Sequence, residues 1–171
     1  MFCAQGVAHQ AAVECLAARS DLVEPRDVRI VERMIRESKT WALVDGLATT
    51  AVGNLVRRPE VNKVLDRWVE DDDFWLRRSA LLALLKPLRA GAGDFDRFAR
   101  YADSMLEEKE FFIRKAVGWV LRETSKKQPQ LVFDWLLPRA GRASGVTVRE
   151  AVKYLPPEKT CRIIAVYERG R

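Results

Sequence analysis

The sequence predicts an all-α protein, a right-handed α-solenoid of about five antiparallel helix pairs in one domain spanning residues 1–171. Apolar residues recur at helical spacing along almost the whole chain, and no segment of useful length alternates as a β-strand does. The leading helices of the pairs begin near residues 5, 41, 73, 110 and 147. This step of roughly 32–37 residues is typical of two-helix repeats, which stack into an array with a long concave face.

Local signals place the individual helices. Pro25, Pro59 and Pro129 fall where the first turn of a helix accepts proline. Thr147-Val-Arg-Glu150 has the pattern of a capping box. The chain opens directly in a helix, with no polar helix to cap the first pair. The expected helices span residues 5–18, 26–38, 41–56, 60–70, 73–88, 94–107, 110–126, 129–138, 147–155 and 158–168.

Composition narrows the possible classes of protein. Hydrophobic residues make up 48% and charged residues 32% of the 171 residues, as in a soluble protein with a substantial core. No apolar run reaches the length of a membrane span, and the first residues lack the features of a signal peptide, so we expect a cytoplasmic protein. Cys3, Cys15 and Cys161 are expected to be reduced and packed as small hydrophobic residues. His9 is the only histidine, so we expect no metal site and no cofactor.

Positive charge is concentrated in the last third of the chain. Residues 111–171 carry thirteen basic and five acidic side chains, a net +8, whereas the whole chain is +6. A localised positive field suits a polyanion such as duplex DNA. From charge alone, the alternative that a basic region only aids solubility is about as good.

Asp45 is the single charge in a stretch of sixteen residues from Trp41 to Val56. A carboxylate in a largely enclosed helix is costly unless it is paired, hydrogen-bonded or functional. Trp41 lies one turn earlier on the same face. An aromatic ring beside a fixed negative charge is suited to holding something flat and cationic.

Four motifs resemble those of one known family. The segment Phe111-Phe-Ile-Arg-Lys-Ala-Val-Gly-Trp-Val-Leu-Arg-Glu123 resembles the signature of the DNA alkylation repair enzymes, the AlkD-like HEAT-repeat DNA glycosylases. Trp41-Ala-Leu-Val-Asp45, Phe74-Trp-Leu-Arg-Arg-Ser-Ala80 and Thr147-Val-Arg-Glu-Ala-Val-Lys153 are similar to further motifs of that family, in the same order. The resemblance extends from about residue 9 to about residue 155. Members usually begin with about two more helix pairs, which have no counterpart in this sequence.

The resemblance implies a HEAT-like solenoid that hydrolyses the N-glycosidic bond of N3- or N7-alkylated purines in duplex DNA, without deep base flipping. Asp45 corresponds to the family's catalytic position and would stabilise an oxocarbenium-like centre or orient water. Trp41 and Trp119 would contact the lesion or its sugar. The expected phosphate contacts are Arg78, Lys115, Arg122, Arg149 and Lys153. With this function, we expect the protein to be a monomer that associates with the nucleoid and does not bind a membrane.

Each role has a structural alternative. Asp45 can be a buried acid paired with Arg78, and Trp41 can be core, because it lies in line with Val44 and Ala48. Lys126 and Lys127, at a helix end, can simply interact favourably with the helix dipole. At the level of the whole protein, the alternatives are a non-catalytic repeat protein that binds particular DNA structures and a helical scaffold for a protein partner.

Overall fold

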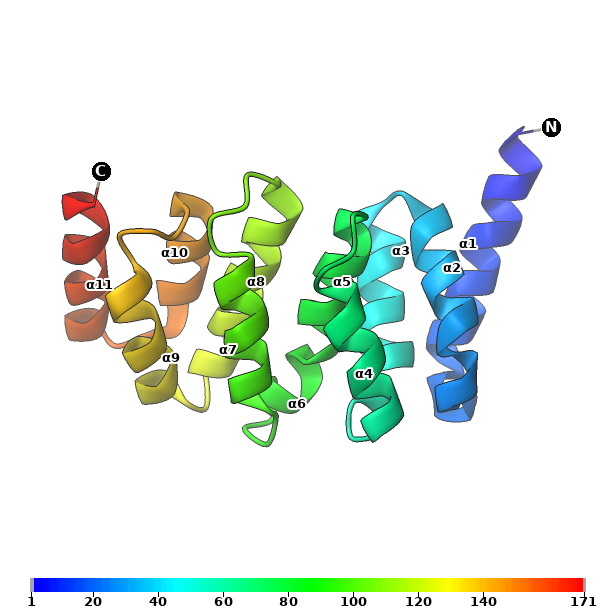
Figure 1. Cartoon of the computed structure of the whole chain (residues 1–171), viewed down its shortest axis with the longest axis horizontal. Helices are drawn as coiled ribbons and strands as arrows, with labels where there is room; N and C mark the ends of the chain where they lie inside the picture. Colours follow the sequence, from blue (N-terminus) through cyan, green and yellow to red (C-terminus); the bar gives the residue numbers. More distant parts are fainter. Residues whose placement is uncertain (1, 171) are drawn as a thin grey trace. The chain divides into compact units, whose positions relative to one another are not determined.

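The computed structural model describes the backbone of residues 2–170 and the side chains at positions 7, 8 and 10–170. Within this range the chain consists of helices and the turns that join them, without a strand (Figure 1). The chain divides into two compact units, Met1–Ala83 and Leu84–Arg171, here called unit 1 and unit 2. The predictions for the Cys3 and His9 side chains lie outside the described residues.

Unit 1 contains two layers of helices. The first layer is formed by α1 (Phe2–Ala18), by α3 (Trp41–Gly46) with its continuation η3 (Leu47–Val52), and by α5 (Phe74–Ala83). Helices α2 (Val28–Ser38) and α4 (Pro59–Trp68) pack against this layer. Its short 3-10 turns are η1 (Ser20–Leu22), η2 (Pro25–Asp27) and η4 (Gly53–Leu55). Trp68 of α4 is fully buried and belongs to the core of unit 1.

Unit 2 continues the same pattern of leading and following helices. Its leading helices α8 (Phe111–Ser125) and α10 (Gly145–Ala151) lie side by side, with α6 (Leu85–Arg89) against α8. The following helices are α7 (Phe95–Ser104), α9 (Pro129–Leu136) and α11 (Pro157–Arg169), and the short turns are η5 (Leu137–Arg139) and η6 (Val152–Tyr154). The rings of Phe98 and Trp135, with centroids 6.3 Å apart, join α7 to α9.

Hydrogen bonds within each unit reproduce the period that the sequence predicts. They join side chains in neighbouring helix pairs that lie 33 to 36 residues apart in the chain. Examples are Arg36 with Asp71, Arg78 with Asp45, Lys115 with Glu150, and Arg139 with Asp103. The repeat is therefore visible in polar contacts as well as in helix spacing.

The helix expected over 73–88 is interrupted. Helix α5 ends at Ala83 and α6 begins at Leu85. Pro87 explains the break, because it has no backbone N–H to donate to the carbonyl of Ala83, and its ring would clash there. The boundary between the two units falls at this break.

The predicted capping box of Thr147 and Glu150 is wrong. Helix α10 begins at Gly145, and Ser144 is its N-cap, since the Ser144 hydroxyl accepts a hydrogen bond from the backbone N–H of Thr147 at 3.1 Å. The Thr147 hydroxyl instead donates to the carbonyl of Arg114 in the preceding repeat. Glu150 is thereby free of a capping role, and its contacts are described below.

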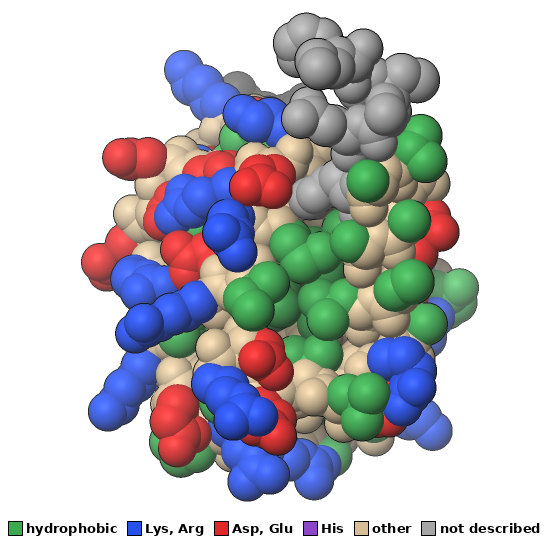
Figure 2. Space-filling view, turned by 90° about the vertical axis from the view of Figure 1, so that its right-hand side faces the viewer, with side chains coloured by type: hydrophobic (Ala, Val, Ile, Leu, Met, Phe, Trp, Pro, Cys, Tyr) green, Lys and Arg blue, Asp and Glu red, His purple; other side chains and the backbone are tan. Residues whose placement is uncertain are grey.

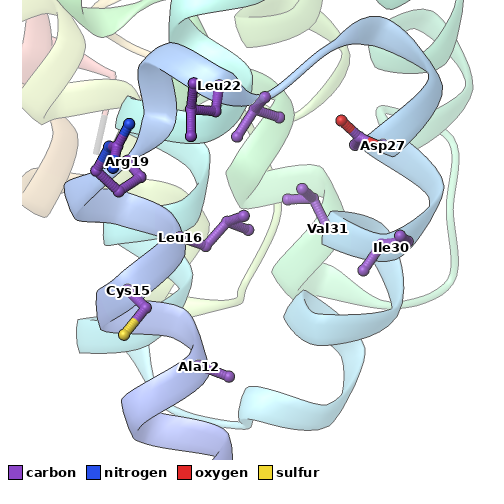
Figure 3. Close-up of a pocket in the computed structure, with 9 residues that line it drawn as sticks. Ala12, Cys15, Leu16, Arg19, Leu22, Asp27, Ile30 and Val31 are labelled. Carbon is purple, nitrogen blue, oxygen red and sulfur yellow. The ribbon is translucent and has the colours of Figure 1, made fainter.

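The α1–α2 end of unit 1 exposes apolar surface. Leu22 and Ile30 are 62% and 50% exposed. Hydrophobic side chains gather in the middle of this face (Figure 2), around a groove of about 470 Å³ between α1 and α2 (Figure 3). Cys15 lines this groove and is exposed, as is Cys161, so the prediction that these thiols are packed is wrong.

Candidate functional site

The helix that carries Asp45 changes geometry directly after it. Residues Trp41–Gly46 are α-helical, whereas Leu47–Val52 form a π-helical segment instead of the continuous α-helix expected over 41–56. The hydroxyls of Thr49 and Thr50 donate to the carbonyls of Asp45 and Gly46, one turn back. Threonine bonds of this kind bend helices. Because π-helical turns are frequent at functional sites, this local geometry draws attention to Asp45.

Asp45 and Arg78 form a bidentate ion pair between α3 and α5. Arg78 Nε donates to Asp45 Oδ1 and Nη2 donates to Oδ2, both at 2.8 Å. The Arg78 side chain is 3% exposed and that of Asp45 is 13% exposed. Two parallel hydrogen bonds fix both the position and the plane of a carboxylate. An ionised carboxylate has about four lone-pair sites, so Asp45 retains acceptor capacity beyond the pair.

Trp41 lies on the solvent side of this helix. Its side chain is 57% exposed, whereas Val44 and Ala48, in line with it, are fully buried. The core-packing alternative for Trp41 is therefore wrong. Unit 1 thus presents an exposed aromatic ring one turn from a carboxylate that Arg78 holds in place.

Trp119 lies on a polar face of α8 in unit 2. Phe111, Lys115, Trp119, Arg122 and Lys126 follow one another at steps of four, four, three and four residues, so they share one side of the helix. All of them are at least partly exposed, whereas most of the positions between them are buried. Trp119 therefore lies among basic side chains.

Glu150 of α10 contacts three basic side chains, two from α8 and one from η6. Lys115 Nζ donates to its Oε1 at 2.7 Å, Lys153 Nζ donates to the same oxygen at 2.8 Å, and Arg122 Nη1 donates to Oε2. The Glu150 side chain is 8% exposed. Burial opposes its ionisation, but the hydrogen bonds from Lys115 and Lys153 outweigh this effect and lower the pKa of Glu150 to about 2.

Glu123 forms a second centre of the same kind. Its carboxylate is 5% exposed and lies 2.8 Å from Arg89 Nε, 2.8 Å from Lys126 Nζ and 3.3 Å from Arg122 Nε. Burial works against the charged form, but the hydrogen bond from Lys126 and the charge of Arg89 lower the pKa of Glu123 below its ordinary value. Arg122 touches both carboxylates, so the two centres form one network, here called the unit 2 basic cluster.

The five residues predicted to contact phosphates lie in three different environments. Lys115, Arg122 and Lys153 meet at Glu150. Arg149 lies apart from them: a methyl group at Gly145 would fall 2.7 Å from Arg149 Nη1, so this guanidinium reaches back over the first turn of α10. Arg78 is buried against Asp45 in unit 1 and presents almost no surface.

Sequence reasoning missed Arg89, Glu123 and Glu150 as members of a polar network. A signal for one of them was present, because Glu150 follows Lys115 by 35 residues, one repeat period. Repeat-spaced residues of opposite charge on leading helices are therefore candidates for such pairs. Arg89 follows the break at Pro87, so no repeat register pointed to it.

Comparison with known proteins agrees with this architecture. The sequence profile of the DNA alkylation repair enzymes matches residues 8–155, and the chain belongs to that family. A solved structure described as a predicted DNA alkylation repair enzyme from Enterococcus faecalis superposes with a TM-score of 0.76 at 24% identity. The match covers 85% of this chain and 67% of the other, and it shows the same fold. No curated protein matches.

Metal-binding groups and membrane-spanning helices are both absent from the described part of the chain. Residues in that part form no group of three or more His, Cys, Asp or Glu side chains placed to hold a metal ion. None of the helices described here is long and apolar enough to cross a membrane.

Proposed function

We propose that this protein is a DNA glycosylase that excises cationic N3- or N7-alkylated purines from duplex DNA. The observation that carries the proposal is the Asp45 carboxylate, fixed by Arg78 one turn from the exposed ring of Trp41. Membership of the DNA alkylation repair family supports DNA as the substrate. The basic surface of unit 2 complements the negative charge of the DNA backbone.

The proposed mechanism needs little acid–base chemistry. An alkylated purine is already cationic, so it leaves with the electron pair of the N-glycosidic bond without a general acid. Positive charge then develops on the sugar, and the fixed carboxylate of Asp45 stabilises that charge. Water adds to the sugar carbon, and the acceptor capacity that Asp45 retains serves to orient this water and take its proton.

The other residues hold the DNA. Trp41 contacts the lesion or its sugar by stacking, and its high exposure suits a lesion approached at the surface rather than in a deep pocket. In unit 2, Trp119 and the surrounding basic side chains of α8 contact duplex DNA. Arg78 acts through Asp45, because its guanidinium is buried against that carboxylate.

One observation favours a second candidate, a DNA-binding repeat protein without catalysis. The bidentate pair gives Asp45 a structural partner, which a purely architectural acid would also have. A single assay distinguishes the two candidate functions. Duplex DNA containing 7-methylguanine is incubated with the protein, and released base is measured by chromatography against unmodified duplex. Release of 7-methylguanine supports the glycosylase, and binding without release supports the second candidate.

A further inference from the structure

The unit 2 basic cluster joins opposite charges in an unequal ratio. Among the described side chains, it contains the two carboxylates of Glu123 and Glu150 and five basic groups: Arg89, Lys115, Arg122, Lys126 and Lys153. The carboxylates are buried, and the cluster retains a net charge of +3. A structural ion pair needs only as many cations as carboxylates, so this surplus calls for an explanation.

The basic groups contact the buried carboxylates on one side and are partly exposed to solvent on the other. The side chains of Lys115, Lys126 and Lys153 are 41%, 38% and 50% exposed. Each ammonium has three N–H donors, and its bond to a buried carboxylate uses one of them. Lysine side chains lose considerable conformational entropy when they are fixed. Here the carboxylates have already fixed them.

An aromatic ring extends the cluster beyond the carboxylates. Lys126 Nζ lies 4.6 Å from the ring centroid of Tyr154, which is 56% exposed. Tyr154 directly follows Lys153 in η6. Lys126 is therefore held by Glu123 on one side and by an aromatic face on the other. The helix dipole alone does not account for its position.

We propose that Glu123 and Glu150 are positioning residues for contact with the DNA backbone. They hold Arg89, Lys126 and the side chains around Glu150 at fixed places, from which the remaining N–H groups bind consecutive phosphates of a duplex. This inference rests on the proposed function, since it takes duplex DNA as the ligand. It adds Arg89 and Lys126 to the phosphate-binding surface and gives two acidic residues a role in binding a polyanion.

Positioning and plain charge predict opposite results when Glu150 is changed. Glu150→Gln raises the net charge of the cluster by one, so charge alone predicts tighter binding. If Glu150 positions the lysines, the same change releases them, and binding becomes weaker despite the added charge. Glu150→Asp keeps the charge but withdraws the carboxylate by one methylene, so only positioning predicts an effect.

The experiment measures the affinity of the full chain for a short undamaged duplex between about 50 and 200 mM salt. The matched control is Glu168→Gln, which makes the same change of charge at an exposed position of α11. We expect Glu150→Gln and Glu150→Asp to bind on the order of tenfold more weakly than the unmodified protein, the size of one lost charge-assisted hydrogen bond. Glu168→Gln should bind equally well or slightly better.

The salt dependence separates positioning from a loss of folded protein. A mispositioned surface contacts fewer phosphates, so the slope of log affinity against log salt should fall by about 1 for Glu150→Asp. Partial unfolding lowers the active concentration and leaves that slope unchanged. Glu123→Gln provides a second variant with the same expectation.

Three outcomes overturn the proposal. If Glu150→Gln tightens binding as much as Glu168→Gln does, or if Glu150→Asp matches the unmodified protein in affinity and slope, the carboxylates do not position the lysines. Either result leaves the proposed glycosylase intact, because base release depends on Asp45 in unit 1. If the unmodified protein shows no salt-dependent duplex binding, both proposals are wrong.

Discussion

Gly118 of α8 lies so close to Glu150 of α10 that a methyl group on its α-carbon would fall 2.7 Å from Glu150 Cβ and 3.0 Å from the carbonyl oxygen of Thr147. Two leading helices can approach this closely only where one of them has no side chain. The approach brings Glu150 within reach of Lys115 and Arg122. A glycine in the middle of a helix is thus a condition for the unit 2 basic cluster.

Gly118→Ala should therefore destabilise the protein although alanine favours helix. Overpacking costs about 1–3 kcal/mol, which exceeds the gain in helix propensity. We expect the melting temperature to fall by about 2–4 °C for each kcal/mol lost. The control is Gly46→Ala, because a methyl group there meets nothing within 4 Å, and this variant should melt at the same temperature or higher. Equal behaviour of the two variants would contradict the close approach of α8 and α10.

Glu150 should also make stability depend on pH. Its pKa is about 2 in the folded protein against 4.5 ordinarily, so the ionised form is favoured by folding. A depressed pKa contributes stability above the unfolded value and loses it as the pH falls, here between 4.5 and about 2. The shift corresponds to at most about 3 kcal/mol. In urea unfolding, the unmodified protein should have a higher free energy of unfolding than Glu150→Gln at pH 7, and this difference should shrink as the pH falls. A constant difference would contradict the ion-pair origin.

The fold could be predicted from the sequence to a greater extent than the site. The period of the leading helices followed from hydrophobic spacing, because burial of one helix face leaves a regular pattern. The π-helical segment after Asp45 did not follow, since threonine hydroxyls accommodate α-helix and π-helix alike. Local pattern likewise assigned Glu150 to a capping box, but two of the three contacts that decide its role come from Lys115 and Arg122, 35 and 28 positions earlier.

The pairing of Asp45 with Arg78 shows the same limit from another side. Sequence reasoning assigned Asp45 to catalysis, kept a structural pair with Arg78 as the alternative, and assigned Arg78 to phosphate. The burial of Arg78 depends on how α5 packs in unit 1, which residue type alone does not encode. Charge identifies a basic residue, but only packing determines whether its guanidinium faces solvent or a carboxylate.

Arg78→Lys tests whether Arg78 acts through Asp45. A lysine keeps the charge but cannot make two parallel hydrogen bonds, so Asp45 loses its fixed plane. We expect excision to fall about tenfold or more and the free energy of unfolding to fall by about 1–3 kcal/mol. The salt slope of duplex binding should not change, because Arg78 is buried. Arg100→Lys, at an exposed position of α7, serves as the control. A reduced salt slope for Arg78→Lys would instead assign Arg78 to a phosphate.

Trp41→Ala separates a ligand contact from a core residue. Since Trp41 is 57% exposed, its removal should change the free energy of unfolding by no more than about 1 kcal/mol. Excision of 7-methylguanine should nevertheless fall about tenfold or more, the usual effect of losing an aromatic ring that stacks on a nucleotide. Trp68→Ala provides the contrast, because Trp68 is fully buried and its loss should cost about 3–5 kcal/mol. Strong destabilisation by Trp41→Ala would return Trp41 to the core.

Asp45→Asn decides between the two candidate functions. The change preserves the shape of the side chain and removes its charge, so a carboxylate that stabilises positive charge on the sugar should lose its effect. We expect excision to fall by at least about 100-fold, as when one fixed electrostatic contact is removed from a transition state. Duplex affinity should be retained or improve, because a negative charge has left a surface that binds a polyanion.

The same variant has a different signature if Asp45 is only structural. Asparagine leaves the buried guanidinium of Arg78 without a charged partner, and breaking a buried pair in this way costs about 3–5 kcal/mol. Both roles therefore allow a lower melting temperature, and only the rate of excision by the folded fraction separates them. The assay is run at a temperature below the melting point of the variant, with Asp96→Asn, at an exposed position of α7, as the matched control. Excision by folded Asp45→Asn at the rate of the unmodified protein would exclude Asp45 as the catalytic residue.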